Sequence, residues 1–147
     1  MNTPLHTSFN PLGERRRWED TAALLMAAFV LFAGVTHFTN PDFFNEIVPP
    51  WLPFSESFYT YVSGVAELII GVMLLKKSTR RQGALAAIWL YVLVYPANLY
   101  MAWDWRDRPA SEQLVSLGRL PFQFVFIWIA WRIADASRPR LTAPGDV

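Results

Sequence analysis

The sequence predicts an all-α membrane protein, a bundle of four transmembrane helices whose N and C termini both lie in the cytoplasm. Three observations predict this fold. Of the 147 residues, 53% are hydrophobic and only 17% are charged, whereas about a quarter of a soluble domain is usually charged. The charged residues avoid four apolar stretches, each about as long as a bilayer-spanning helix. Basic residues gather at the ends expected to face the cytoplasm.

The four predicted spans cover about residues 21–38, 58–75, 83–103 and 118–134. They form a transmembrane domain at 21–134, between a cytoplasmic N-terminal tail at 1–20 and a cytoplasmic C-terminal tail at 135–147. Length and lack of charge support this prediction, because helical periodicity is hard to test in segments that are apolar almost all round. A signal peptide at the first span is disfavoured by its long apolar run and by the spans that follow.

The basic residues orient the spans. Most of the 13 Lys and Arg residues lie in the N-terminal tail, in the connection at 76–82 and at the C-terminal end, and none lies in the connection at 39–57. Because basic residues near span ends stay on the cytoplasmic side, we expect 39–57 to face outward from a bacterial cytoplasmic (inner) membrane. This outer loop is apolar and rich in proline, which prevents a long helix. It lies either in the membrane interface or as a lid over a pocket.

Five polar side chains fall in the outer half of the predicted bundle, and they are His37, Glu67, Asn98, Arg119 and Gln123. Glu67 lies near the middle of its span, where a charged acid costs roughly 2.5–3.5 kcal/mol on insertion scales. An ion pair with Arg119 or protonation of the carboxyl group would offset that cost. Glu67 either belongs to a ligand pocket or holds the bundle together by bonding to Asn98 or Gln123.

Small residues predict how the first two spans pack. Gly64 and Gly71 share a helix face with Glu67, and Gly34 shares a face with His37. Small side chains let two membrane helices approach closely. We therefore expect these two faces to meet, which directs Glu67 toward the protein interior.

Several chemistries are absent from the sequence. It contains no cysteine and only two histidines, which excludes disulfides and cysteine-held metal or iron–sulfur sites, and we predict no metal site. A formal net charge of +1 does not indicate a nucleic-acid surface. No phosphate-binding loop or nucleophile elbow is present.

Five stretches carry a resemblance to a known family: AGVTHFTNPDFF, IVPPWLPF, SGVAELIIGVMLL, YPANLYMAW and RLPFQFVFIWIAW, in this order over residues 33–131. The sequence resembles the DoxX-like family of small bacterial integral membrane proteins. The resemblance implies a four-helix membrane bundle. The family includes a subunit associated with thiosulfate:quinone oxidoreduction and members joined to redox-stress complexes. The positions that match the family pattern are His37, Pro41, Glu67, Pro96, Asn98, Arg119, Pro121 and Gln123.

The first functional hypothesis is a redox-linked membrane protein that binds a quinone or similar lipophilic ligand, not held covalently, in the outer half of the bundle. Glu67 would handle a proton, and His37, Asn98, Arg119 and Gln123 would contact the ligand's polar head. Because the chain supplies no electron carrier, a redox partner subunit would be needed. The alternative is a non-catalytic anchor or assembly subunit of a partner complex, and a small transporter ranks third. Membrane lipid and a second copy of the chain are the other expected partners.

Overall fold

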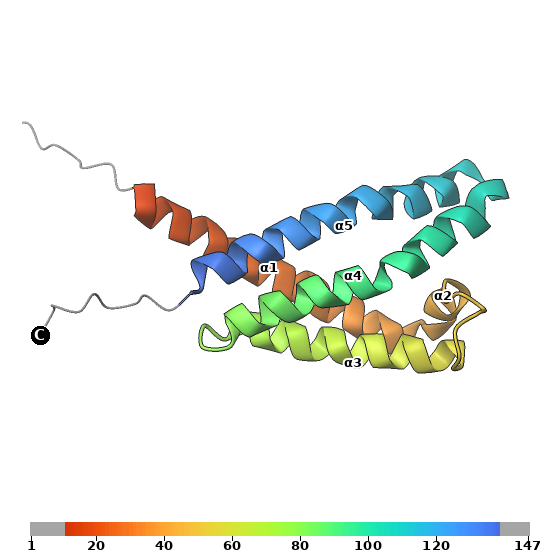
Figure 1. The fold of residues 1–147 in the computed structure, drawn as a ribbon, viewed down its shortest axis with the longest axis horizontal. Helices are drawn as coiled ribbons and strands as arrows, with labels where there is room; N and C mark the ends of the chain where they lie inside the picture. The colour runs from red at the N-terminus through yellow and green to blue at the C-terminus, as the bar shows by residue number, and fades with distance from the viewer. Residues whose placement is uncertain (1–10, 139–147) are drawn as a thin grey trace, which may run out of the picture.

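The computed structural model describes residues 11–138, with side chains from residue 18 onward, and these residues form four long helices and two short ones (Figure 1). The elements are α1 (Pro11–Thr39), α2 (Pro41–Glu46), α3 (Glu56–Leu75), α4 (Arg80–Asp104), the 3₁₀ turn η1 (Trp105–Asp107) and α5 (Ala110–Ala136). No strand occurs within residues 11–138. Four helices are long and apolar enough to cross a membrane, which confirms the predicted all-α, four-span fold.

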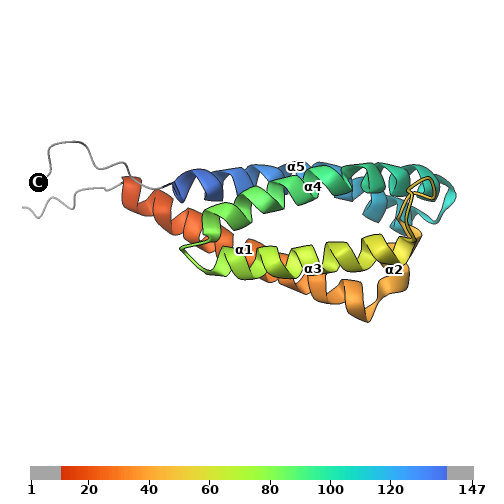
Figure 2. The same ribbon diagram turned by 60° about the horizontal axis from the view of Figure 1, so that its bottom comes forward.

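The long helices form two antiparallel pairs, α1 with α3 and α4 with α5, and α4 also packs on α3 (Figures 1 and 2). The start of α1, the end of α5 and the α3–α4 connection lie at one end of the bundle. We call the opposite end, which carries α2 and η1, the α2 end. In Figure 1 the second half of α4 turns away from α3 and follows α5. Pro96 lies in this half of α4, and proline removes one backbone hydrogen bond from a helix interior.

The α1–α3 contact is built on small residues, as predicted. Gly34 and Gly64 face each other so closely that a Cβ atom on Gly64 would lie 2.7 Å from the His37 Cβ and 3.3 Å from the Gly34 carbonyl oxygen. A Cβ on Gly71 would lie 2.5 Å from the Leu31 Cγ. Close approach of the two backbones increases the van der Waals contact between the helices. Such contact stabilises the pair, because the hydrophobic effect is weak between helices that are already surrounded by lipid.

Gly64→Ala is therefore expected to destabilise the bundle by about 1–3 kcal/mol, the usual cost of overpacking. The obstructing His37 Cβ is attached to the α1 backbone and cannot rotate away. Gly118→Ala is the matched control, because a Cβ there meets nothing within 4 Å. Thermal unfolding in detergent measures both variants. Equal melting temperatures would contradict the close α1–α3 contact.

Two helix boundaries differ from the sequence prediction. α1 begins at Pro11, inside the predicted tail at 1–20. α5 begins at Ala110, so most of the predicted connection at 104–117 is helical. Both extensions are rich in polar residues. A search for long apolar stretches finds only the membrane-crossing part of a helix and not its full extent. α5 ends at Ala136, and residues 139–147 of the predicted C-terminal tail lie outside the described residues.

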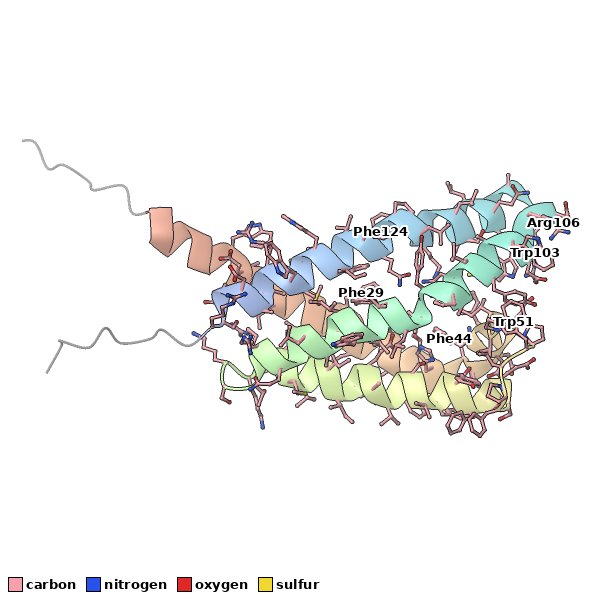
Figure 3. The ribbon with its side chains drawn as sticks, in the orientation of Figure 1. Phe29, Phe44, Trp51, Trp103, Arg106 and Phe124 are labelled. Atoms are coloured by element: carbon pink, nitrogen blue, oxygen red, sulfur yellow. The ribbon has the colours of Figure 1, made fainter. Side chains whose placement is uncertain are left out.

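The loop at 40–55 caps the α2 end. Ile47, Met101 and Trp105 form a buried apolar cluster there, with Phe43 and Phe44 packed against it. On the other side of the loop, the side chains of Trp51 and Phe54 are more than half exposed. The loop thus covers the bundle with its first half and presents aromatic rings outward with its second half. Figure 3 shows Phe44 within this end and Trp51 at its edge.

Polar contacts fasten this cap. The Thr60 hydroxyl donates to Asn45 Oδ1 at 2.7 Å, which joins α3 to α2. Arg108 binds Glu46 of α2 and Glu112 of α5. The hydrogen bond that Arg108 donates to Glu46 is the main cause that raises the pKa of Arg108 further above its usual range. This arginine therefore stays charged and neutralised by its acidic neighbours.

Candidate functional site

A buried contact between an imidazole and a carboxyl group lies where α1 and α3 meet, toward the α2 end. His37 Nε2 and Glu67 Oε2 are 3.3 Å apart, and their side chains are 9% and 16% exposed. The small-residue faces create this pair, since His37 follows Gly34 by one turn and Glu67 follows Gly64 by one turn. His37 is the direct partner that Glu67 needs inside the membrane, in place of the expected Arg119, Asn98 or Gln123.

Arg119 reaches the same region from α5. It interacts electrostatically with both Glu67 and His37, but it forms no salt bridge or hydrogen bond within the described residues. The long α5 explains its position. Arg119 lies nine residues after Ala110, about 13 Å along a helix, and not at the start of the helix as the sequence suggested.

Asn98 and Gln123 form a separate hydrogen-bonded chain between α4 and α5. Asn98 Nδ2 donates to Gln123 Oε1 at 2.6 Å, and Gln123 Nε2 donates to the Tyr91 carbonyl oxygen. Both side chains are buried, with 7% and 3% of their residue surfaces exposed. The hydrogen bond between these two amides therefore fixes the distance between α4 and α5. Neither amide is the partner of Glu67, which contacts His37 instead.

Tyr91 connects the two groups and was missed by the sequence analysis. Its carbonyl belongs to the Gln123 chain, and its side chain interacts electrostatically with Glu67. The Tyr91 hydroxyl oxygen is buried and has no hydrogen-bond partner among the described residues. A sequence signal existed, because Tyr91 precedes Asn98 by seven residues and so lies on the same face of α4.

The site thus contains two kinds of polar group: the Asn98 and Gln123 amides, which are hydrogen-bonded, and others that lack hydrogen-bond partners among the described residues. Among the described residues, Glu67 Oε2 is also buried without a hydrogen-bond partner, although it lies 3.3 Å from His37 Nε2. An unpaired buried polar group costs about 1–3 kcal/mol, so Glu67 and Tyr91 together hold unmet hydrogen-bonding capacity beside the Arg119 guanidinium. We call these three residues, with His37, the polar cluster.

An aromatic ring covers the polar cluster on the side of the α2 end. The Phe44 ring of α2 stacks on the His37 ring, with centroids 3.6 Å apart and planes at 24°, so α2 covers the cluster on this side. Among the described residues, no group of three His, Cys, Asp or Glu side chains is placed to hold a metal ion. What the cluster offers is one acid, one imidazole, one phenol and one guanidinium in an apolar surrounding.

Comparison with known proteins gave one match. A family model described as a domain of unknown function (DUF8561) matches residues 26–134, a range that includes every residue of the polar cluster and of the Asn98–Gln123 chain. Neither a curated protein nor a solved structure matches the chain.

Proposed function

The chain belongs to the family of the domain of unknown function DUF8561, and we propose that it is a redox-linked membrane protein that binds a quinone or similar lipophilic ligand at the polar cluster. One observation carries this proposal. Among the side chains that the structure describes, the Tyr91 hydroxyl and Glu67 Oε2 are buried without hydrogen-bond partners, and Arg119, which interacts electrostatically with Glu67, forms no salt bridge. Buried polar groups are nearly always satisfied. A ligand carbonyl that accepts from Tyr91 and Arg119 would satisfy the tyrosine, and it would also satisfy Glu67 when the carboxyl group is protonated and donates to it.

The residues would divide the work. Arg119 and Tyr91 donate to a ligand oxygen, and Glu67 exchanges a proton with it, held in place by His37. Asn98 and Gln123 bond to each other, so in this proposal they keep the α4–α5 wall at the correct distance. Reduction of a quinone to a quinol takes up two electrons and two protons. The chain has no cysteine to hold an iron–sulfur cluster, so a redox partner subunit would exchange the electrons. The DoxX-like resemblance supports this redox link.

The test is direct binding. A benzoquinone with a ten-carbon alkyl side chain is titrated into the purified full chain in lipid nanodiscs, and binding is followed by the quenching of tryptophan fluorescence. Saturable binding is expected, together with a rise in melting temperature, since a ligand that binds only the folded state stabilises it. Quinone uptake that grows linearly, as in empty nanodiscs, would refute the proposal.

The proposed orientation places the α2 end outside a bacterial inner membrane and both termini in the cytoplasm. The charges support this. Exposed Lys76 and Lys77 lie in the α3–α4 connection. Arg106 and Arg108 at the α2 end form ion pairs with acidic side chains. Arg80 and Arg132 at the opposite end do so as well, so the two exposed lysines carry the difference between the ends.

Single cysteines can test the orientation cleanly, because the chain has none of its own. Ser78→Cys and Asp107→Cys place one thiol at an exposed position at each end. In intact spheroplasts, a membrane-impermeant maleimide is expected to label residue 107 at once and residue 78 only after permeabilisation. The reverse pattern would invert the topology.

The alternative function is a non-catalytic anchor or assembly subunit of a partner complex. The Asn98–Gln123–Tyr91 chain favours it, because interhelical hydrogen bonds of this kind hold membrane bundles together. In that case Glu67→Gln would lower the melting temperature, and no quinone would raise that of the unmodified chain.

A further inference from the structure

An apolar groove of about 410 Å³ lies between α1 and α5, on the side of the polar cluster away from the α2 end. Figures 1 and 2 show why it forms: α1 and α5 cross near the start of α1 and then diverge toward the α2 end. Its walls are large apolar side chains: Trp18, Leu25, Met26, Phe29, Phe126 and Ile129. Grooves of this size and lining are typical of sites for small lipophilic molecules.

A column of aromatic rings joins the groove to the polar cluster. The Phe29 and Phe126 rings, both in the groove wall, stack with centroids 4.7 Å apart and planes at 22°. Phe126 also stacks on Tyr91, with centroids 5.6 Å apart and planes at 20°. The hydroxyl of that same Tyr91 is the unpartnered donor near Glu67. Figure 3 shows Phe29 midway along the bundle, between the two ends.

We propose that this groove holds the hydrocarbon tail of the ligand whose head lies at the polar cluster. This rests on the proposed function and narrows it to amphiphiles that have a polar ring and a long apolar chain. The tail would run along α1 and α5 from Phe126 toward Trp18, while the ring stays beside Tyr91.

The charges near the groove favour this occupant over a phospholipid. The cation at its far end, Arg132, lies over the Trp18 and Trp128 rings, and its Nη2 is 2.9 Å from Glu19 Oε1. Because Glu19 neutralises Arg132, an anionic headgroup gains little there. A ligand with a neutral apolar tail needs no charged partner near Arg132, and its polar ring would lie at the polar cluster.

A photoreactive probe tests the proposal on the full chain in nanodiscs. The probe is a benzoquinone whose ten-carbon chain ends in a diazirine, and labelled residues are read by mass spectrometry. Labels are expected on Leu25, Phe29 and Ile129, and excess unlabelled quinone should abolish them. Labels on α3, or scattered over lipid-facing residues while the quinone still binds, would overturn the groove assignment and leave the head site standing. Failure of any quinone to bind would remove both proposals together.

Filling the groove supplies the second readout. Ala22 lines the groove, so Ala22→Phe should abolish the groove labels and weaken binding of the long-tailed quinone. The loss should be modest, roughly three- to tenfold, because lipid is as apolar as the groove and only packing is lost. Ala28→Phe, at an exposed position of the same helix, is the matched control. Binding of the ring without a tail should not change in either variant. If excess phospholipid abolishes the groove labels and excess quinone does not, the groove binds lipid acyl chains, contrary to the proposal.

Discussion

Arg132→Met is expected to destabilise the bundle by roughly 3 kcal/mol, because it leaves a buried carboxylate without its cation. The partner is Glu19, whose side chain is only 8% exposed, with its Oε1 2.9 Å from Arg132 Nη2. The pair joins α1 to α5 where these helices cross. The methionine keeps the apolar stem of arginine, so the loss comes from the charge and from the contacts of the guanidinium with Trp18 and Trp128.

A double variant separates these causes. Glu19→Gln combined with Arg132→Met removes the stranded charge, so it should recover most of the lost stability in thermal unfolding. Arg138→Met is the matched control, because its ion pair with Asp135 is far more exposed and such pairs contribute little. If Arg132→Met melts at the temperature of the unmodified chain, this ion pair does not hold α1 and α5 together.

The fold was predictable because bilayer thickness sets a length that can be read from the sequence. The four apolar stretches had to be helices, since only internal hydrogen bonding satisfies the backbone in lipid. The start of α5 at Ala110 was not predictable by the same reasoning. Residues 110–117 form the first turns of α5 and include polar side chains such as Gln113 and Ser116. A search for long apolar stretches does not detect such residues as part of a helix. That extension is what carries Arg119 into the bundle.

The site was predictable in composition and less so in its pairings. An acid within an apolar span demands a partner, and the glycine spacing indicated that Glu67 faces α1. The choice of His37 over Arg119 depends on how closely Gly34 and Gly64 let the helices approach, which no residue pattern specifies in ångströms. Tyr91 escaped notice because an aromatic residue in an apolar span usually serves packing, and its unpaired hydroxyl is visible only in three dimensions.

Arg119→Met is expected to weaken quinone binding roughly 10- to 100-fold, since a hydrogen bond from a charged donor is worth about 1.5–3 kcal/mol. Glu67→Gln should weaken it as well, because an amide N–H is a weaker hydrogen-bond donor to the ligand oxygen than the O–H of a protonated carboxyl group. Arg106→Met is the matched control, an arginine at the α2 end whose side chain is 53% exposed. Binding that is equally strong in all three variants would remove the polar cluster from the ligand site.

Tyr91→Phe distinguishes a ligand site from a purely structural role, because it removes the hydroxyl and leaves the backbone carbonyl that Gln123 binds. Without ligand, removal of a buried hydroxyl that has no partner should leave the melting temperature unchanged or raise it. The quinone, which is proposed to accept from this hydroxyl, should bind more weakly, by roughly threefold to tenfold for a neutral hydrogen bond. A purely structural role acts through the Tyr91 carbonyl oxygen, which phenylalanine keeps, so it predicts no change in ligand affinity. The two measurements on one variant therefore decide whether the unmet hydrogen bond of Tyr91 belongs to a ligand or to the protein.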